Sequence, residues 1–254
     1  MTDKDKRGKG AVKKKLPKET IAKARDLEVK WSLPRPIALQ IAQGKQDLTE
    51  VLQKIQLKEK VARLMAREEI LPALGPQVVA GTWTLERALF HTRLRARKSA
   101  PDYMRCFLDD YAREQRPIAL SLVGGELVQG KVVESRPFDL TFCPRDSSDE
   151  TTIVKHDIKF FFDATRRKHL LKAIKWGTAE TAITSDHLRR IGARTDIKAR
   201  VLLEMQESEK AIEWQTLEGD CIRGRITWFG RYEVQLQTAK GDVIVMRHAV
   251  AAIA

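Results

Sequence analysis

Two sets of residues with binding chemistry recur in the C-terminal part of the chain. Each set joins an aromatic residue in a predicted turn to a later pair made of a basic residue and a histidine. The sets are Phe138 with Lys155 and His156, and Tyr232 with Arg247 and His248. Such aromatic residues can also fill a core, and such histidines can bond to backbone carbonyls at a strand end. Recurrence in two diverged copies favours a shared binding role, and both interpretations stay open.

Residues arranged for catalysis do not stand out in the sequence. There are no paired carboxylates, no cluster with metal-ligand spacing and no nucleophile beside a base, so the acidic residues are typical of solvated faces. The three cysteines are far apart and odd in number, which predicts reduced thiols: Cys106, Cys143 and Cys221. We therefore expect no enzymatic activity, no metal and no cofactor.

The charge of the chain indicates the class of partner. Its 47 Lys and Arg residues exceed its 34 Asp and Glu residues, giving a formal net charge of +13 over 254 residues. Such an excess attracts phosphates by counterion release, so nucleic acid or the ribosome is the favoured partner and an anionic membrane surface stays possible. No apolar run approaches the roughly 20 residues of a membrane helix, and no signal-peptide core is present, so we expect a cytoplasmic protein.

Two stretches of predicted strands must position the recurring sets. Apolar and polar residues alternate over 117–160 and 211–253, which is typical of strands with one buried face. Glycines that allow tight turns separate the strands, among them Gly124-Gly125, Gly219, Gly230 and Gly241. An amphipathic helix is predicted before each stretch, over 102–115 and near 197–206.

The N-terminal part is predicted to be helical and repetitive. Gly44 and Gly81 end two short helices that each begin near a proline, and they lie 37 residues apart. Asp47 and Thr84 are then placed to cap the following helices. A DNA-reading helix-turn-helix is disfavoured because no polar recognition helix is distinguishable, so we predict a docking module for RNA or a protein.

These patterns divide the chain into five segments. Residues 1–17 are a disordered basic arm, 18–99 the helical module with two helix-turn-helix repeats, and 165–195 a basic helical linker. The strand-rich domains are residues 100–164 and 196–254. The predicted fold class is α+β.

The strand-rich segments resemble the Sm-like superfamily and, within it, the bacterial Hfq family of RNA chaperones. The second copy carries the family landmarks in order: Gly219, Gly224, Phe229, Tyr232, Arg247, His248, Ala249 and Val250. The first carries residues 113–117, Gly124-Gly125, residues 136–140 and residues 153–158. The resemblance covers roughly the last 150 residues. It implies two tandem, strongly bent, five-stranded antiparallel barrels, each with a preceding helix.

The resemblance also implies an RNA site. The family stacks a base of uridine-rich RNA on the turn aromatic and donates hydrogen bonds from the Lys-His pair. Those roles fall on the two recurring sets. The residue that reads uracil in the family is Pro137 or Arg231 here, and Arg231 favours phosphate or guanine.

Other family surfaces are carried only in part. On the face that binds adenine-rich RNA, Ser121, Gln215, Leu127 and Cys221 replace the expected residues and Gln129 keeps the type, so A-tract binding should be weak or absent. Arg113 and Arg116 correspond to the basic rim.

Assembly and function follow from the same resemblance. The family closes a six-membered ring by pairing the fourth strand of one unit with the fifth of the next, so a tandem chain implies either a trimer or a monomer with an internal pair. Asp157 and Lys159 place charge in the first copy's last strand, where the family is apolar or small, so both alternatives stay open. We expect an Hfq-like chaperone or post-transcriptional regulator of small RNA or mRNA; the alternative is a ribosome-associated structural or assembly factor.

Overall fold

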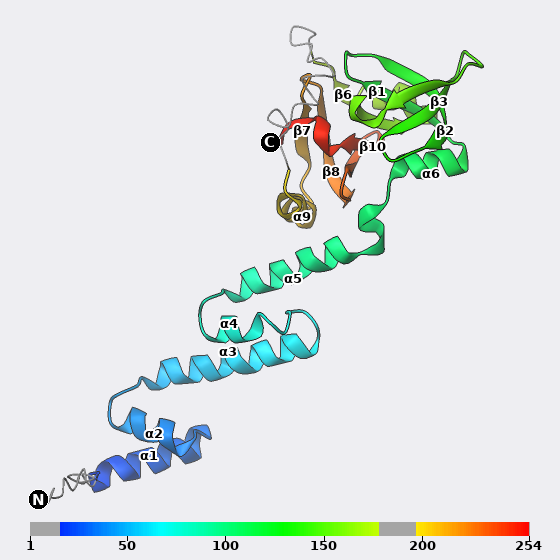
Figure 1. The fold of residues 1–254 in the computed structure, drawn as a ribbon. Helices are drawn as coiled ribbons and strands as arrows, with labels where there is room; N and C mark the ends of the chain where they lie inside the picture. Colours follow the sequence, from blue (N-terminus) through cyan, green and yellow to red (C-terminus); the bar gives the residue numbers. More distant parts are fainter. Residues whose placement is uncertain (1–15, 178–196, 254) are drawn as a thin grey trace, which may run out of the picture. The chain divides into compact units, whose positions relative to one another are not determined.

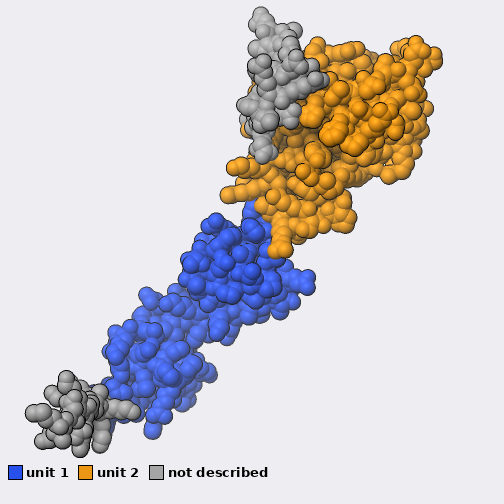
Figure 2. All heavy atoms as spheres, in the orientation of Figure 1, with its two compact units in different colours: residues 1–92 blue, residues 93–254 orange. Residues whose placement is uncertain are grey.

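The computed structural model describes residues 16–177 and 197–253 (Figure 1). The chain separates into two compact units, residues 1–92 and residues 93–254, each of which is described by itself (Figure 2). The predicted N-terminal arm, apart from its last two residues, lies outside the described residues, as does most of the linker between the strand-rich segments. The predicted domain boundaries therefore stay predictions.

The first unit is helical and contains two small cores. One cluster gathers around Ala38 and Ile41, and the other around Ile70 and Val78. The predicted caps are present: Asp47 accepts a hydrogen bond of 3.0 Å from the Glu50 N–H, and Thr84 accepts one of 3.2 Å from the Arg87 N–H. The helices are α1 (Lys18–Trp31), α2 (Arg35–Ala42), α3 (Leu48–Ala66), α4 (Gly75–Val79) and α5 (Leu85–Ser99), the last of which continues into the second unit.

The helix predicted over 102–115 is interrupted in the second unit. A 3-10 turn, η1 (Pro101–Met104), precedes α6 (Phe107–Glu114). In an unbroken helix the Phe107 N–H would donate to the Tyr103 carbonyl. Here Glu233 accepts from Phe107 and the Arg231 N–H donates to Tyr103, so residues from later strands replace the helical bond.

Eleven antiparallel strands among the described residues join in one open sheet in the order β11-β7-β8-β9-β10-β5-β1-β2-β3-β4, with β6 on β8. The first strand group consists of β1 (Pro117–Leu122), β2 (Leu127–Ser135), β3 (Asp139–Pro144), β4 (Thr151–Val154) and β5 (Ile158–Asp163). The second strand group consists of β7 (Ile212–Thr216), β8 (Cys221–Phe229), β9 (Glu233–Thr238), β10 (Gly241–Met246) and β11 (Val250–Ile253), and α9 (Ala199–Ser208) precedes it.

Both strand groups have the same internal order, with the fifth strand beside the first and the fourth at the other edge. They meet where β10 pairs with β5 through Ile244↔Phe161 and Val245↔Phe160. The α+β class and the antiparallel strands are confirmed. Two separate closed barrels are not observed, because the strand pairing runs through both groups and ends openly at β4 and β11.

An apolar core joins α6 and the first strand group to β10 of the second. Leu108 and Tyr111 of α6 pack with Phe161 of β5 and with Ile244 and Met246 of β10. A register shift interrupts the pairing of β2 with β3 and, at the matching place, that of β8 with β9, which bends each group.

The basic linker helix predicted from residue 165 is much shorter in the structure. After η3 (Ala164–Arg166), α7 covers only Arg167–Leu170, and β6 (Ile174–Lys175) then pairs with Cys221 and Ile222, the first two residues of β8. The apolar Ile174 is 4 % exposed, so burial against the second strand group outweighs continued helix.

Candidate nucleic-acid interface

The two turn aromatics are exposed rather than part of the core. Phe138 is 74 % exposed and Tyr232 is 54 % exposed. In the first strand group the Phe138 carbonyl accepts a hydrogen bond of 2.9 Å from the Lys155 N–H, and in the second the Tyr232 carbonyl accepts one of 2.9 Å from the Arg247 N–H. The same backbone contact therefore brings each aromatic residue next to its basic residue, and both rings are open to a stacking partner.

The two histidines lie together at the joint between the strand groups. His156 belongs to η2 (Lys155–Asp157), directly before β5, and His248 to η6 (Arg247–Ala249), directly after β10. Their ring centroids are 5.0 Å apart with an interplanar angle of 37°. The pairing of β10 with β5 thus brings together the histidines of the two predicted sets, which lie far apart in the sequence.

His248 is also tied to the backbone. Its Nε2 lies 3.1 Å from the carbonyl oxygens of both His156 and Ile158. Because carbonyls only accept, Nε2 carries the proton, and in the neutral ring Nδ1 is the acceptor. The interpretation that a strand-end histidine bonds to carbonyls therefore holds for His248.

The two basic residues of the sets hold the protein together around this site. The Lys155 Nζ lies 3.7 Å from an Asp109 carboxylate oxygen, and its side chain is 13 % exposed. Arg247 donates to the carbonyls of Gly230 and Arg231, at 3.2 and 2.8 Å, and to that of Ile197. The side-chain donors of Lys155 and Arg247, which the sequence predicts to bond to RNA, are thus directed at groups of the protein itself. Their contribution to the site is mainly their charge and their position.

Arg231 extends the site on the side of the second strand group. Its guanidinium carbon lies 5.3 Å from the centroid of the Tyr232 ring, and the residue is exposed. A cation over one face of the ring favours stacking and phosphate contact in the same place.

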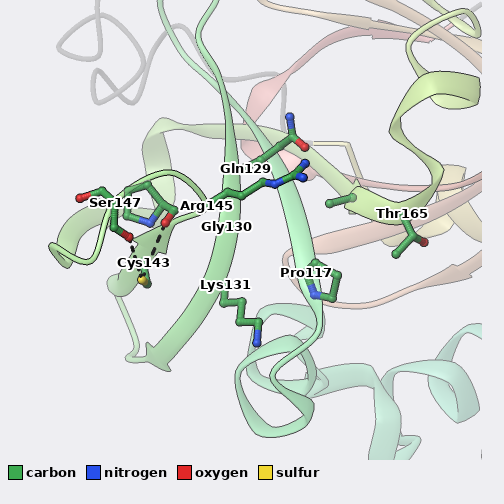
Figure 3. A pocket seen from close by; sticks show the side chains of 10 residues that line it. Pro117, Gln129, Gly130, Lys131, Cys143, Arg145, Ser147 and Thr165 are labelled. Carbon is green, nitrogen blue, oxygen red and sulfur yellow. Dashed lines mark hydrogen bonds between the residues drawn. The ribbon is translucent and has the colours of Figure 1, made fainter.

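The remaining predicted residues lie in α6, directly after it and on β2. Arg113 bridges to Asp110, and Arg116 to Glu114 at 2.7 Å with its guanidinium over the Tyr111 ring. These carboxylates neutralise much of the predicted basic rim. Gln129 lies on β2 and lines a pocket (Figure 3).

A buried ionic cluster crosses from one strand group to the other. Lys159 on β5 is 2 % exposed, and its Nζ lies 2.5 Å from Glu218 and 2.6 Å from Asp220, both at the turn between β7 and β8. The Gly124 N–H in the first group's turn also donates to Glu218, at 2.5 Å. The charge at Lys159 in the first group's last strand is therefore paired within the chain and links the two strand groups. Its partners lie 59 and 61 residues away, and no local pattern identifies them.

The part of the chain that the structure describes holds neither a membrane-spanning helix nor a metal-ligating cluster. No helix among the described residues is long and apolar enough to cross a membrane. Within the same residues, no group of three or more His, Cys, Asp or Glu side chains is placed to hold a metal ion.

Comparison with known proteins gives little beyond these observations. No protein-family model matches the sequence, and no curated protein matches it. Among solved structures, a crystal structure of Hfq, described as a pleiotropic translational regulator, is similar over 23 % of this chain and 97 % of its own, with 19 % identity and a TM-score of 0.22. That score is too low to carry an argument.

Proposed function

We propose that this chain is an RNA-binding protein whose two strand groups are tandem Sm-like domains, and that it acts as a chaperone or post-transcriptional regulator without enzymatic activity. The observation that carries the proposal is the pair of adjacent histidines at the joint, each from a strand group that also presents an exposed turn aromatic bonded to its basic residue. Aromatic faces with nearby cations are the usual means of holding unstacked single-stranded bases.

The repeated strand order supports the assignment of two related domains. Each group runs fifth, first, second, third, fourth across the sheet, and the fourth strand of the second group pairs with the fifth of the first. A chance arrangement of ten strands has no reason to repeat this order together with the matching backbone bonds from Lys155 to Phe138 and from Arg247 to Tyr232.

The charge of the chain supports a polyanionic partner. A net charge of +13 promotes association with RNA of any sequence, so specificity has to be measured against this background. Uridine preference and ribosome association are separate outcomes of the test below.

The test compares wild type with Phe138→Ala/Tyr232→Ala in binding to U-rich, A-rich and structured RNA at several salt concentrations. Both side chains are exposed, so the variant should fold, and loss of stacking should weaken binding to single strands by roughly 5- to 150-fold per base. Trp31→Ala, which removes an exposed aromatic from the first unit, is the matched control.

The pattern of losses decides between functions. A loss confined to single-stranded RNA supports the proposal, and a larger loss on U-rich RNA adds base preference. Unchanged affinity for all three RNAs would remove the joint as the RNA site. Binding only to structured RNA, with co-sedimentation on ribosomal subunits at moderate salt, would favour the ribosome-associated alternative.

A further inference from the structure

A pocket in the first strand group is lined by residues of β1, β2 and β3 and of the segments that follow β3 and β5. Its volume is about 480 Å³, within the usual range of small-molecule sites. Figure 3 shows Pro117 and Thr165 on one side in this view and Cys143 and Ser147 on the other. Its lining includes Gln129, Gly130, Lys131, Arg145 and Ser147.

The backbone around the pocket is closely fitted. A Cβ on Gly130 would lie 2.1 Å from the Cys143 carbonyl oxygen, so only glycine allows β2 and β3 to approach this closely. The Arg145 N–H donates to the Gln129 carbonyl at 2.8 Å, which fixes the first residue after β3 against β2. Gln129, Lys131 and Arg145 are therefore presented from a defined backbone.

The lining is positively charged and unneutralised. Lys131 and Arg145 are both exposed, and within the described part of the chain neither forms an ion pair. No carboxylate belongs to the described lining. Asp163, next to the lining residues Ala164 and Thr165, accepts hydrogen bonds of 2.8 and 2.5 Å from the Thr165 N–H and hydroxyl. Two cations that form no ion pair with the described residues favour an anion, and a guanidinium matches the oxygens of a phosphate.

The remaining groups suit the rest of a nucleotide. The Gln129 amide and the Ser147 hydroxyl can donate and accept hydrogen bonds, while the rings of Pro117 and Pro144 offer apolar surface. We propose that this pocket binds a phosphate-bearing nucleotide, with Lys131 and Arg145 on the phosphate and Gln129 on the sugar or base. The nucleotide is either free or the phosphorylated end of an RNA strand.

The site is particular to the first strand group and separate from the histidine pair. At the matching place after Gly224, the second group carries Arg225, whose Nε donates to the Gln237 side chain at 2.8 Å. The proposal therefore does not rest on RNA binding at the joint, and either can fail alone.

The experiment measures binding of inorganic phosphate, the four nucleoside 5′-monophosphates, and a short RNA with either a 5′-phosphate or a 5′-hydroxyl. Wild type is compared with Lys131→Gln/Arg145→Gln. The charge-matched control is Lys210→Gln/Lys240→Gln, at exposed positions outside the lining. All the substituted side chains are exposed, and circular dichroism and thermal unfolding check that each variant folds.

We expect the pocket variant to bind mononucleotides or 5′-phosphorylated RNA at least tenfold more weakly than wild type, and the control to stay within twofold of wild type. Saturable mononucleotide binding identifies the free nucleotide as the ligand. Binding that requires the 5′-phosphate on RNA identifies the strand end. Equal losses in the two variants, or no difference between phosphorylated and hydroxyl RNA together with no nucleotide binding, would overturn the proposal.

Discussion

The carboxylate of Glu233 accepts a hydrogen bond of 2.7 Å from the Phe107 N–H, so the first residue of β9 holds the first residue of α6. Glu233 is 1 % exposed, and its other oxygen lies 3.3 Å from the Cys106 Sγ. Burial raises the pKa of Glu233 to about 7, although the bond from Phe107 lowers it. Burial, and then the charge of Glu233, raise the pKa of the Cys106 thiol to about 12, so the thiol stays protonated and faces the carboxylate as a donor.

The pKa of Glu233 predicts that stability falls as pH rises. The group binds its proton more tightly in the folded chain, with a pKa of about 7, than at its ordinary value of 4.5. The contribution of Glu233 to the free energy of unfolding is complete below pH 4.5 and is lost as pH rises through 7. At about 1.4 kcal/mol per pKa unit, the loss is up to ~3 kcal/mol. Lys155 and Asp109 face the same site and act in opposite directions on this carboxyl. Glu233→Gln keeps an acceptor for Phe107 and should flatten the dependence, measured as the free energy of unfolding in urea at pH 5 and pH 8.

Glu126→Gln serves as the control for that measurement, because it removes an exposed carboxylate from the first strand group. It should keep the wild-type difference between the two pH values. An undiminished difference in Glu233→Gln would assign the pH dependence to other groups.

The Lys159 cluster predicts a large cost for removing the buried cation. Lys159→Met leaves the carboxylates of Glu218 and Asp220, which are 10 % and 4 % exposed, without their shared partner. We expect a loss of about 3–5 kcal/mol in the free energy of unfolding, by chemical denaturation.

Two comparisons test the cause of that loss. Lys240→Met, at an exposed position, should change stability by less than about 0.5 kcal/mol. Adding Glu218→Gln and Asp220→Asn to Lys159→Met should recover part of the loss, because the unpaired buried charges are then gone. A triple variant no more stable than Lys159→Met would point to packing instead.

Local patterns in the sequence predict the elements but not their joints. Period-2 alternation and glycine turns locate the strands, and Asp47 and Thr84 locate two helix starts, because these signals depend on neighbouring residues. The break in the helix before Phe107 depends on Glu233 and Arg231, more than 120 residues later, so no local signal predicts it.

The candidate site divides in the same way. The sequence identifies the recurring aromatic, basic and histidine residues, yet the meeting of the two histidines depends on β10 pairing with β5. It also suggests free donors on Lys155 and Arg247, whereas Asp109 and the Ile197 carbonyl engage them. The cations of the pocket carry no motif, because Lys131 and Arg145 are brought together only by the pairing of β2 with β3.

Matching glycines in the two strand groups predict unequal costs. A Cβ on Gly130 would lie 2.1 Å from the backbone oxygen of Cys143, whereas one on Gly224 would lie 3.0 Å from that of Gln237. Gly130→Ala should therefore lower the free energy of unfolding by roughly 1–3 kcal/mol or more, and Gly224→Ala should lower it by less. Thermal unfolding of the two variants provides the comparison, each serving as the other's control. Equal costs would mean that the strands shift apart as easily in one group as in the other.

The open edges of the sheet predict how chains assemble. The sheet ends at β4, a fourth strand, and at β11, a fifth strand, and a fourth strand already pairs with a fifth where β10 meets β5. If β4 of one chain pairs with β11 of another in the same manner, three chains close a ring without free edges. Native mass measurement should then find three chains.

Thr151→Lys/Thr152→Lys, at exposed positions of β4, should shift the protein to single chains, because charge on an edge strand opposes pairing. Thr227→Lys, at an exposed position of the interior strand β8, should stay trimeric. A wild-type mass of one chain would mean that the only joint between a fourth and a fifth strand is the one within the chain.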